Sequence, residues 1–358
     1  MSKNTIKWTK RDKLKTKPDE STLPFGKIFT DYMMKMRYEA GSGWSDPEIV
    51  PYGPIELDPA AMVLHYGQTV FEGLKAYRNE NGDVQLFRPE ENMKRMNRSH
   101  RRMSIPEFDG ETVLKALSQL IDIEKDWVPS VEGTSLYVRP FVISTQTHLA
   151  VHPSDSYEFY IILSPVGSYY PEGINPVKIQ VEDEFTRAVK GGTGTAKTGG
   201  NYSAGYNAQE KASKSGHAQV LWLDAIEKQY IEEVGSMNVF FKINGEIVTP
   251  ALSGSILEGV TRKSIIELLH SWEIPVMERK ISIQELIQAQ KNGTLEEAFG
   301  AGTAAVVSPI GSFTYKGVAY KVQDGETGSL TKKLYDTVTG IQTGKLDDPF
   351  GWTKVIHV

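Results

Sequence analysis

The most unusual local composition in the chain surrounds a lysine. Residues 191–200 read GGTGTAKTGG, so Lys197 lies among glycines and other small residues. Small neighbours let the backbone approach a bulky ligand closely and leave the amine little competing packing. The amine could therefore act as a nucleophile or a base toward a bound ligand, although an exposed lysine on a flexible loop would give the same pattern.

Three established motifs resemble this stretch, and each of them fails. The phosphate-binding loop of nucleotide triphosphatases requires glycine directly before Lys-Ser/Thr, where this chain has Ala196. The dinucleotide fingerprint GxGxxG would need glycine at position 197, which is the lysine. The elements of penicillin-binding serine enzymes occur as KTG at 197–199, SMN at 236–238 and SLTK at 329–332, but in the reverse order. The stretch alone identifies no enzyme class.

Composition narrows the class of partner. Lys plus Arg number 40 and Asp plus Glu number 45, and this net charge of −5 gives no reason to expect nucleic acid or an anionic membrane as partner. The sequence has no cysteine, which excludes disulfides, thiolate metal sites and cysteine nucleophiles. The seven histidines contain one pair at helical spacing, His148 and His152, without a third ligand in sequence. We therefore predict small-molecule substrates and no metal.

The length of 358 residues predicts about two domains of an enzyme-sized protein. The first twenty residues are lysine-rich without the apolar core of a signal peptide, and no apolar run reaches the roughly 18 residues of a membrane helix. We therefore expect a cytoplasmic protein. The predicted parts are an N-terminal arm at 1–24, a smaller domain at 25–168, an interdomain loop at 169–176 and a larger C-terminal domain at 177–358.

The sequence predicts both strands and helices as the elements that position Lys197 and its neighbours. Asn81-Gly82 and Asn244-Gly245 each separate two apolar segments and predict β-hairpins whose turns use positive φ angles. TSLYVRPFVIST and YEFYIILSP predict strands, and helices are expected at 89–103, 111–124, 260–271, 282–290 and 330–340. Because the elements alternate without a sustained βαβ repeat, the sequence predicts mixed α/β or α+β domains and no Rossmann sheet.

Eight blocks in order resemble the branched-chain amino acid aminotransferases, which are pyridoxal-phosphate enzymes of fold type IV. The blocks are FTDYM, LHYGQTVFEGLKAY, LFRPEENMKRM, SLYVRP, KTGGNY, EEVGSMN, EGVTR and GAGTAAVVSP. They extend over nearly the whole chain. The resemblance implies a smaller N-terminal α/β domain, a larger C-terminal pseudo-barrel domain and the cofactor pyridoxal 5'-phosphate (PLP).

Transamination explains why these residue types are wanted. It needs an amine that condenses with the cofactor aldehyde and then moves a proton between substrate and cofactor carbons, and the resemblance assigns this catalytic role to Lys197. A carboxylate must keep the cofactor ring nitrogen protonated, and the match to EVG selects Glu233 over Glu232. Val260 and Thr261 open a predicted helix whose N-terminal N–H groups suit the phosphate. The other cofactor contacts implied by the family are Arg95, Tyr202, Ser236 and Thr303.

The substrate pocket must accept an aliphatic side chain in one half-reaction and the carboxylate of glutamate in the other. Aromatic walls with one cation would serve both. The resemblance assigns the distal carboxylate to Arg139, and the α-carboxylate to Tyr137 with the backbone of Thr303 and Ala304. It gives the walls as Phe29, Phe71, Tyr137 and Tyr169. In the family, residues at Tyr66 and Val151 reach in from the partner subunit, so the resemblance also implies a homodimer.

Two positions depart from the family pattern. Some members carry CxxC after GTA, where this chain has Ala305 and Ser308 and so lacks that redox pair. Many members have LPG where this chain has LEG at 257–259, a change expected to alter loop stiffness without removing a ligand.

The sequence thus predicts exchange of the amino group between leucine, isoleucine or valine and 2-oxoglutarate, giving branched 2-oxo acids and L-glutamate. A D-amino acid aminotransferase or a lyase of the same superfamily is the alternative within the fold, and the YVRP block argues against both. A non-catalytic protein that binds phosphate ligands is the alternative from another class.

Overall fold

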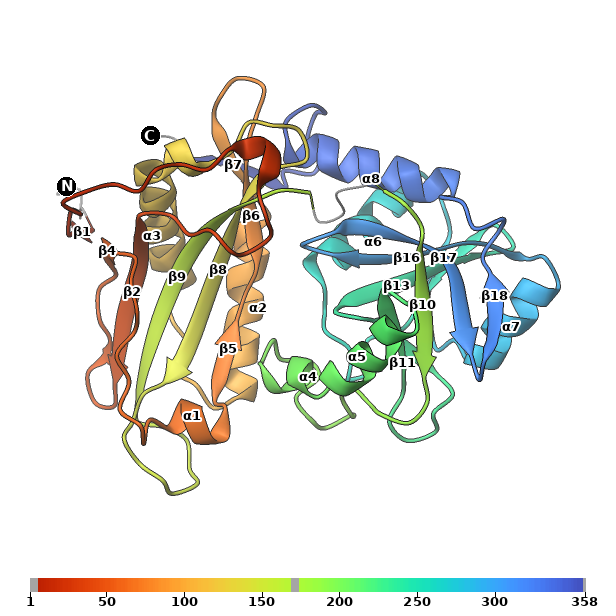
Figure 1. The fold of residues 1–358 in the computed structure, drawn as a ribbon, viewed down its shortest axis with the longest axis horizontal. Coiled ribbons are helices and arrows are strands. Elements are labelled where there is room, and N and C mark those ends of the chain that lie inside the picture. The colour runs from red at the N-terminus through yellow and green to blue at the C-terminus, as the bar shows by residue number, and fades with distance from the viewer. Residues whose placement is uncertain (1–5, 169–173, 357–358) are drawn as a thin grey trace. The chain divides into compact units, whose positions relative to one another are not determined.

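The computed structural model describes residues 6–168 and 174–356, which form two compact units (Figure 1). The first unit comprises the described residues of Met1–Tyr169 together with Ala196–Gly199 and Gly340–Val358. The second comprises the described residues of Tyr170–Thr195 and Gly200–Thr339. Lys197 therefore belongs to the first unit although its flanking segments belong to the second. The predicted loop at 169–176 lies largely outside the described residues, and its limits stay a prediction.

A mostly antiparallel sheet forms the first unit. Its main path contains β1 (Lys7–Trp8), β4 (Glu48–Pro51), β2 (Tyr32–Glu39), β9 (Ser156–Val166), β8 (Ser135–Ser144), β6 (Leu74–Arg78), β7 (Val84–Phe87) and β19 (Thr353–Ile356), in that spatial order. Two short strands join it from the side: β3 (Gly43–Trp44) pairs with β2, and β5 (Thr69–Phe71) pairs with β8. The C-terminal strand β19 pairs with β7, so the two ends of the sequence complete one sheet.

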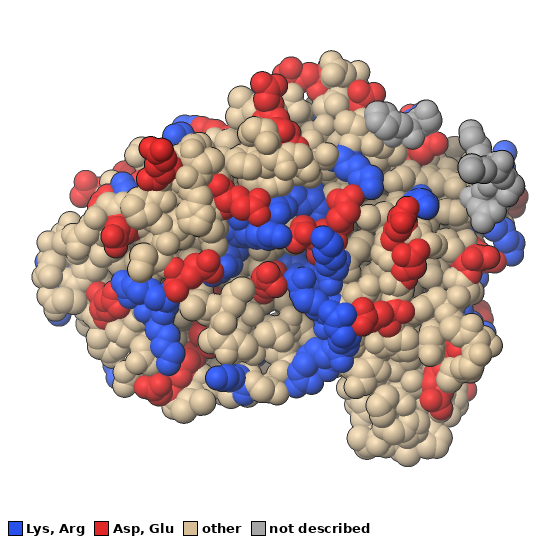
Figure 2. Space-filling model, turned by 180° about the vertical axis from the view of Figure 1, so that it is seen from behind, with Lys and Arg blue, Asp and Glu red and all other residues tan. Residues whose placement is uncertain are grey.

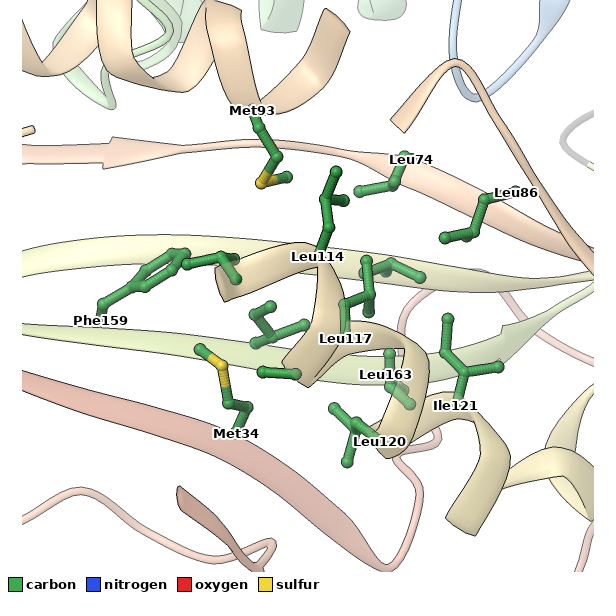
Figure 3. Close-up of a cluster of buried hydrophobic side chains, with 14 of the residues drawn as sticks. Met34, Leu74, Leu86, Met93, Leu114, Leu117, Leu120, Ile121, Phe159 and Leu163 are labelled. Carbon is green, nitrogen blue, oxygen red and sulfur yellow. The ribbon is translucent and has the colours of Figure 1, made fainter. Parts of the chain in front are cut away.

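Two helices, α2 (Pro89–Arg102) and α3 (Gly110–Ile123), pack on this sheet. Helix α2 begins at a proline, whose missing N–H is not needed at that position, and Asp109 caps α3 by accepting hydrogen bonds from the N–H groups of Glu111 and Thr112. Figure 3 shows the resulting core, in which the apolar face of α3 meets side chains from the strands. The labelled members are Met34, Leu74, Leu86, Met93, Leu114, Leu117, Leu120, Ile121, Phe159 and Leu163.

The second unit is built around a closed sheet. Strands β12 (Ile231–Val234), β11 (Gln219–Leu223), β10 (Val177–Glu182), β17 (Val306–Tyr315), β16 (Leu295–Gly302) and β13 (Met237–Ile243) follow one another, and β12 pairs with β13 to close the ring. Closure leaves no edge strand within the ring. The strands β14 (Glu246–Thr249), β15 (Val276–Glu278) and β18 (Val318–Lys321) extend it. The helices of this unit are α4 (Gly200–Ser203), α5 (Tyr206–Lys214), α6 (Val260–Ser271), α7 (Ile283–Lys291) and α8 (Ser329–Gln342), the last of which ends in the first unit.

Both hairpins expected from the sequence are confirmed by the pairings of β6 with β7 and of β13 with β14. Asn244 and Gly245 have φ angles of 51° and 79°, as the predicted turn requires. The other turn differs, because only Gly82 has a positive φ, of 85°. There the Asn79 side chain accepts hydrogen bonds from the N–H groups of Asn81 and Asp83, which sets a longer loop.

Figure 2 shows one face of the molecule, on which basic side chains gather in a band near the middle of the view and acidic side chains lie around them. No helix within residues 6–168 and 174–356 is long and apolar enough to cross a membrane. Within the same residues, no three histidine, aspartate or glutamate side chains gather into a group that could hold a metal ion.

Two carboxylates are buried where the N-terminal arm meets the first sheet. Asp31 and Glu124 are 1% and 2% exposed. Asp31 accepts hydrogen bonds from the N–H of Lys15 at 2.7 Å and from Nε1 of Trp127 at 2.9 Å. Glu124 accepts a hydrogen bond from the N–H of Tyr32. Burial raises the pKa of Glu124 to about 7, and the charge of Asp31 acts in the same direction.

The raised pKa of Glu124 predicts a pH dependence of stability. Because the folded state binds this proton more tightly than the unfolded chain, the wild type loses stability as the pH rises from about 4.5 to about 7. Glu124→Gln lacks this titration. The free energy of unfolding of the variant, taken relative to that of the wild type, should therefore be about 1–3 kcal/mol higher at pH 8 than at pH 4.5. Urea unfolding of both proteins at both pH values measures this change. The same difference in free energy of unfolding at pH 4.5 and pH 8 would contradict the prediction.

Candidate active site

The backbone of Lys197 is held by hydrogen bonds to other residues of the first unit. Its carbonyl accepts from the N–H of Phe71 at 3.0 Å, and its own N–H donates to Oγ of Ser99 on α2 at 2.9 Å. The neighbouring Thr198 donates its hydroxyl proton to the carbonyl of Thr69 at 2.7 Å. Lys197 is half-buried, so the alternative of an exposed lysine on a flexible loop is wrong.

Phe71 brings three of the predicted residues together. Nζ of Lys197 lies 4.7 Å from the centre of the Phe71 ring, and Cζ of Arg139 lies 4.8 Å from the same centre. Arg139 also donates from Nη2 to the hydroxyl of Tyr137 at 2.9 Å. Tyr137 and Arg139 are two residues apart on β8, which places both side chains on one face of the sheet.

Arg139 has unused capacity for an anion. Its Nε atom is buried, and no described residue accepts a hydrogen bond from it. A buried donor without a partner costs about 1–3 kcal/mol, which binding of a carboxylate would recover. The arrangement of Arg139, Tyr137 and Phe71 can therefore hold a carboxylate beside an apolar surface.

A buried carboxylate that the sequence analysis did not select lies beside this group. Glu72 is completely buried and accepts hydrogen bonds from Nε of Arg95 at 2.7 Å, from Nη2 of Arg95 at 2.9 Å and from Asn92 at 2.8 Å. Burial by itself would favour the neutral acid, but the charges of Arg95 and Lys197 outweigh it and lower the pKa of Glu72. Glu72 thus remains an anion that orients Arg95. Its place in the block VFEGLKAY is the only signal that could have indicated it.

The two adjacent glutamates of β12 have different surroundings in the second unit. Glu233 accepts a hydrogen bond from the N–H of Leu257 at 2.8 Å and forms an ion pair with Nε of Arg187 at 3.0 Å. Glu232 accepts from the hydroxyl of Ser255, and burial raises the pKa of Glu232. Glu233 is therefore the one of the two whose negative charge faces an arginine at ion-pair distance. Arg187 has no local signal in the sequence apart from its place just before the glycine-rich stretch, so it was not predicted.

The N-terminus of α6 has backbone N–H groups without a side-chain partner at its cap. Its N-cap residue is Gly259, which provides no side-chain cap, and Val260 and Thr261 in the first turn are buried. A Cβ atom at Gly259 would lie 2.1 Å from Oδ1 of Asn238, so a larger residue there would require the Asn238 side chain to move. Asn238 also donates from Nδ2 to the carbonyl of Leu257 at 2.9 Å. Backbone N–H groups in such a position suit a phosphate.

Two turns carry the remaining predicted cofactor contacts of this unit. Thr303 and Ala304 lie in the turn between β16 and β17, and Ser236 lies in the turn between β12 and β13. The pairing of Asn238 with Ala301 places Ser236 and Thr303 at the same end of two neighbouring strands. Tyr202 is half-buried on α4.

The other predicted pocket residues all belong to the first unit or lie outside the description. Phe29 is half-buried and stacks on Tyr52 with ring centres 5.0 Å apart. Tyr66 and Val151 are 42% and 84% exposed. The hydroxyl of Tyr66 donates to the carbonyl of Leu149, which joins α1 (Met62–Tyr66) to the segment that carries Val151. Tyr169 lies outside the described residues.

Known proteins resemble this chain in sequence and in fold. Residues 69–313 match the family model described as amino-transferase class IV. The chain is 61% identical to branched-chain-amino-acid aminotransferase 2 of Bacillus subtilis, over 99% of this chain and 98% of that one. Its fold resembles the Escherichia coli branched-chain amino acid aminotransferase with a TM-score of 0.76, at 26% identity over 91% of this chain and 99% of that one. It also resembles the Thermobaculum terrenum enzyme solved in its PLP form, with a TM-score of 0.75 at 21% identity over 92% and 99% of the two chains.

These matches define a class IV aminotransferase. Within that class, the chain belongs to the branched-chain amino acid aminotransferase family. The fold-type IV architecture expected from the resemblance is confirmed, including the barrel-like closed sheet of the second unit.

Close packing in the glycine-rich stretch requires a residue without a side chain at one position, which can be tested. A Cβ atom at Gly194 would lie 2.1 Å from the carbonyl oxygen of Ser255, whereas a Cβ atom at Gly200 would meet no atom within 4 Å. Gly194→Ala should lower the free energy of unfolding by about 2 kcal/mol or more, because backbone atoms must shift. Gly200→Ala is the matched control and should change it by less than about 1 kcal/mol. Urea unfolding of both variants measures the difference, and equal stability would refute the packing requirement.

Proposed function

We propose that this aminotransferase transfers the amino group of leucine, isoleucine or valine to 2-oxoglutarate, giving branched 2-oxo acids and L-glutamate. The observation that carries the proposal is the arrangement around Phe71, where the amine of Lys197 and the guanidinium of Arg139 contact one aromatic ring. An amine, an apolar surface and a cation in one place suit both an aliphatic and an acidic substrate. The name of the Bacillus subtilis relative, at 61% identity, supports the substrate class.

The family depends on PLP, and the side chains of this protein fit that cofactor. When bound, PLP supplies an aldehyde that bonds an amine reversibly and a ring that accepts electrons. The donor set includes a lysine whose backbone is held by a hydrogen bond, a glutamate that faces an arginine, and a helix N-terminus without a side-chain cap. The residues proposed to hold the cofactor are Lys197, Glu233, Tyr202, Arg95, Ser236, Val260, Thr261 and Thr303.

Each part of the chain has one task in this proposal. Lys197 bonds the cofactor and later carries the proton on its Nζ atom. Glu233 holds the ring nitrogen protonated, and Tyr202 donates a hydrogen bond to the cofactor hydroxyl. The N–H groups at the start of α6, with Arg95, Ser236 and Thr303, hold the phosphate.

Substrate specificity rests on the first unit in this proposal. Arg139 binds the distal carboxylate of glutamate, and Tyr137 with the backbone at Thr303 and Ala304 binds the α-carboxylate. Phe29, Phe71 and Tyr169 provide apolar walls. We further propose a homodimer in which Tyr66 and Val151 serve the partner's pocket, because both side chains are exposed on the isolated chain and neither packs in its core.

Lys197→Ala tests the reactive amine. Borohydride reduction of the wild type with PLP, followed by peptide mapping, should place the pyridoxyl label on Lys197. The variant should carry no label there and should lose at least about 1,000-fold in kcat, because the amine proposed to bond the cofactor and to carry the proton is gone. Lys190→Ala changes an exposed lysine of the same segment and should behave as the wild type. A label on another lysine of the wild type would overturn the assignment.

Arg139→Gln tests the dual-substrate pocket. Removing the cation should raise KM for 2-oxoglutarate about 10- to 100-fold and change KM for 4-methyl-2-oxopentanoate less than about threefold, because only the first has a distal carboxylate. Steady-state kinetics with both oxo acids measures this ratio. Equal effects on the two substrates would remove Arg139 from the distal site.

The stereochemistry of the substrate separates this proposal from the D-amino acid alternative. The visible absorbance of the PLP-loaded protein should change faster with L-leucine than with D-alanine at equal concentrations. A faster change with D-alanine would favour the D-amino acid aminotransferase.

A further inference from the structure

Arg187 is a buried cation to which the proposed function gives no task. The residue is 9% exposed, and its side chain is 7% exposed. A buried charge is costly unless other groups compensate it, so its partners indicate why it is retained.

The guanidinium of Arg187 joins three segments of the second unit. Its Nε atom lies 3.0 Å from Oε2 of Glu233 on β12. Its Nη2 atom donates to the carbonyl of Ser255, in the loop before α6, and to the carbonyl of Gly194, in the glycine-rich stretch, at 3.3 Å. A Cβ atom at Gly194 would collide with this same Ser255 carbonyl, so the glycine is required for the close approach of the two backbones beneath Arg187.

Glu233 is constrained through both of its carboxylate oxygens. One oxygen accepts from the N–H of Leu257 at 2.8 Å, and the other faces Arg187. Donors and a cation at these positions favour the ionised form of a carboxylic acid over the neutral form. The neighbouring Glu232 accepts from the hydroxyl of Ser255, and burial raises its pKa although the charge of Arg187 acts in the opposite direction.

We propose that Arg187 is a positioning residue that keeps Glu233 ionised and in place for the ring nitrogen of PLP. This inference rests on the proposed function, in which Glu233 meets that nitrogen. In this proposal Arg187 acts on the cofactor through the carboxylate of Glu233. Without Arg187, the carboxylate of Glu233 takes up a proton more easily and loses its negative charge. The proton on the ring nitrogen is then no longer held there and passes to solvent.

The test uses PLP labelled with ¹⁵N at the ring nitrogen, bound to the full-length protein. The wild type at pH 7.5 should show the ¹⁵N chemical shift of a protonated pyridine. Arg187→Gln should move the shift toward that of the unprotonated ring and lower kcat about 10- to 100-fold, with KM for leucine changed less than about threefold. Arg187→Lys keeps the charge and should restore the protonated shift at least in part.

Glu232→Gln is the matched control. It neutralises the other buried carboxylate of β12 while its side-chain oxygen can still accept from Ser255, so the ¹⁵N shift should remain that of the wild type. An unchanged shift in Arg187→Gln, or an equal change in Glu232→Gln, would overturn the proposal.

Two further measurements distinguish a loss of folding from a loss of function. If Arg187→Gln fails to fold by far-UV circular dichroism, the double variant Arg187→Gln/Glu233→Gln should fold better, because it leaves no uncompensated carboxylate. Equal loss of folding in both proteins would overturn the pairing. Borohydride labelling of Lys197 in the wild type tests the proposed function by itself, so a failure there is distinguishable from a failure of the Arg187 proposal.

Discussion

The constraint on which this structure depends is that a charge inside a protein must be compensated. In the first unit, the fully buried Glu72 is held by the guanidinium of Arg95. In the second, Glu233 faces the guanidinium of Arg187. Burial alone would favour the neutral acid, but the charges of Arg95 and Lys197 lower the pKa of Glu72, which therefore remains an anion.

Lys197 lies on a short chain segment, Ala196–Gly199, that belongs to the first unit, although the segments on both sides of it belong to the second. Hydrogen bonds to β5 and α2 fix the backbone of Lys197, so the small residues around it do not make it mobile. At Gly194, the lack of a side chain is needed for close packing against Ser255.

The closed sheet explains why so many polar groups of the second unit are buried. All four residues of β12 are buried, including Glu232 and Glu233 on opposite faces of the strand. The turns at the ends of β12 and β16 and the N-terminus of α6 supply polar groups that do not take part in the strand ladder. A ring of paired strands thus provides a rigid support, and several of the residues proposed to hold the cofactor lie in its connections.

The sequence by itself determined the local elements and the family. The predicted helix at 260–271 agrees with α6, the hairpin at Asn244-Gly245 has the expected positive φ angles, and the ordered motifs indicated a class IV aminotransferase. These features depend on neighbouring residues, whose periodicity and turn chemistry can be read directly. Only the tertiary structure decided that Arg95 faces Glu72, that Arg187 faces Glu233, and that Lys197 hydrogen-bonds to Ser99, 98 residues away. Such contacts join segments that are distant in sequence, and no local pattern specifies which buried cation compensates which carboxylate.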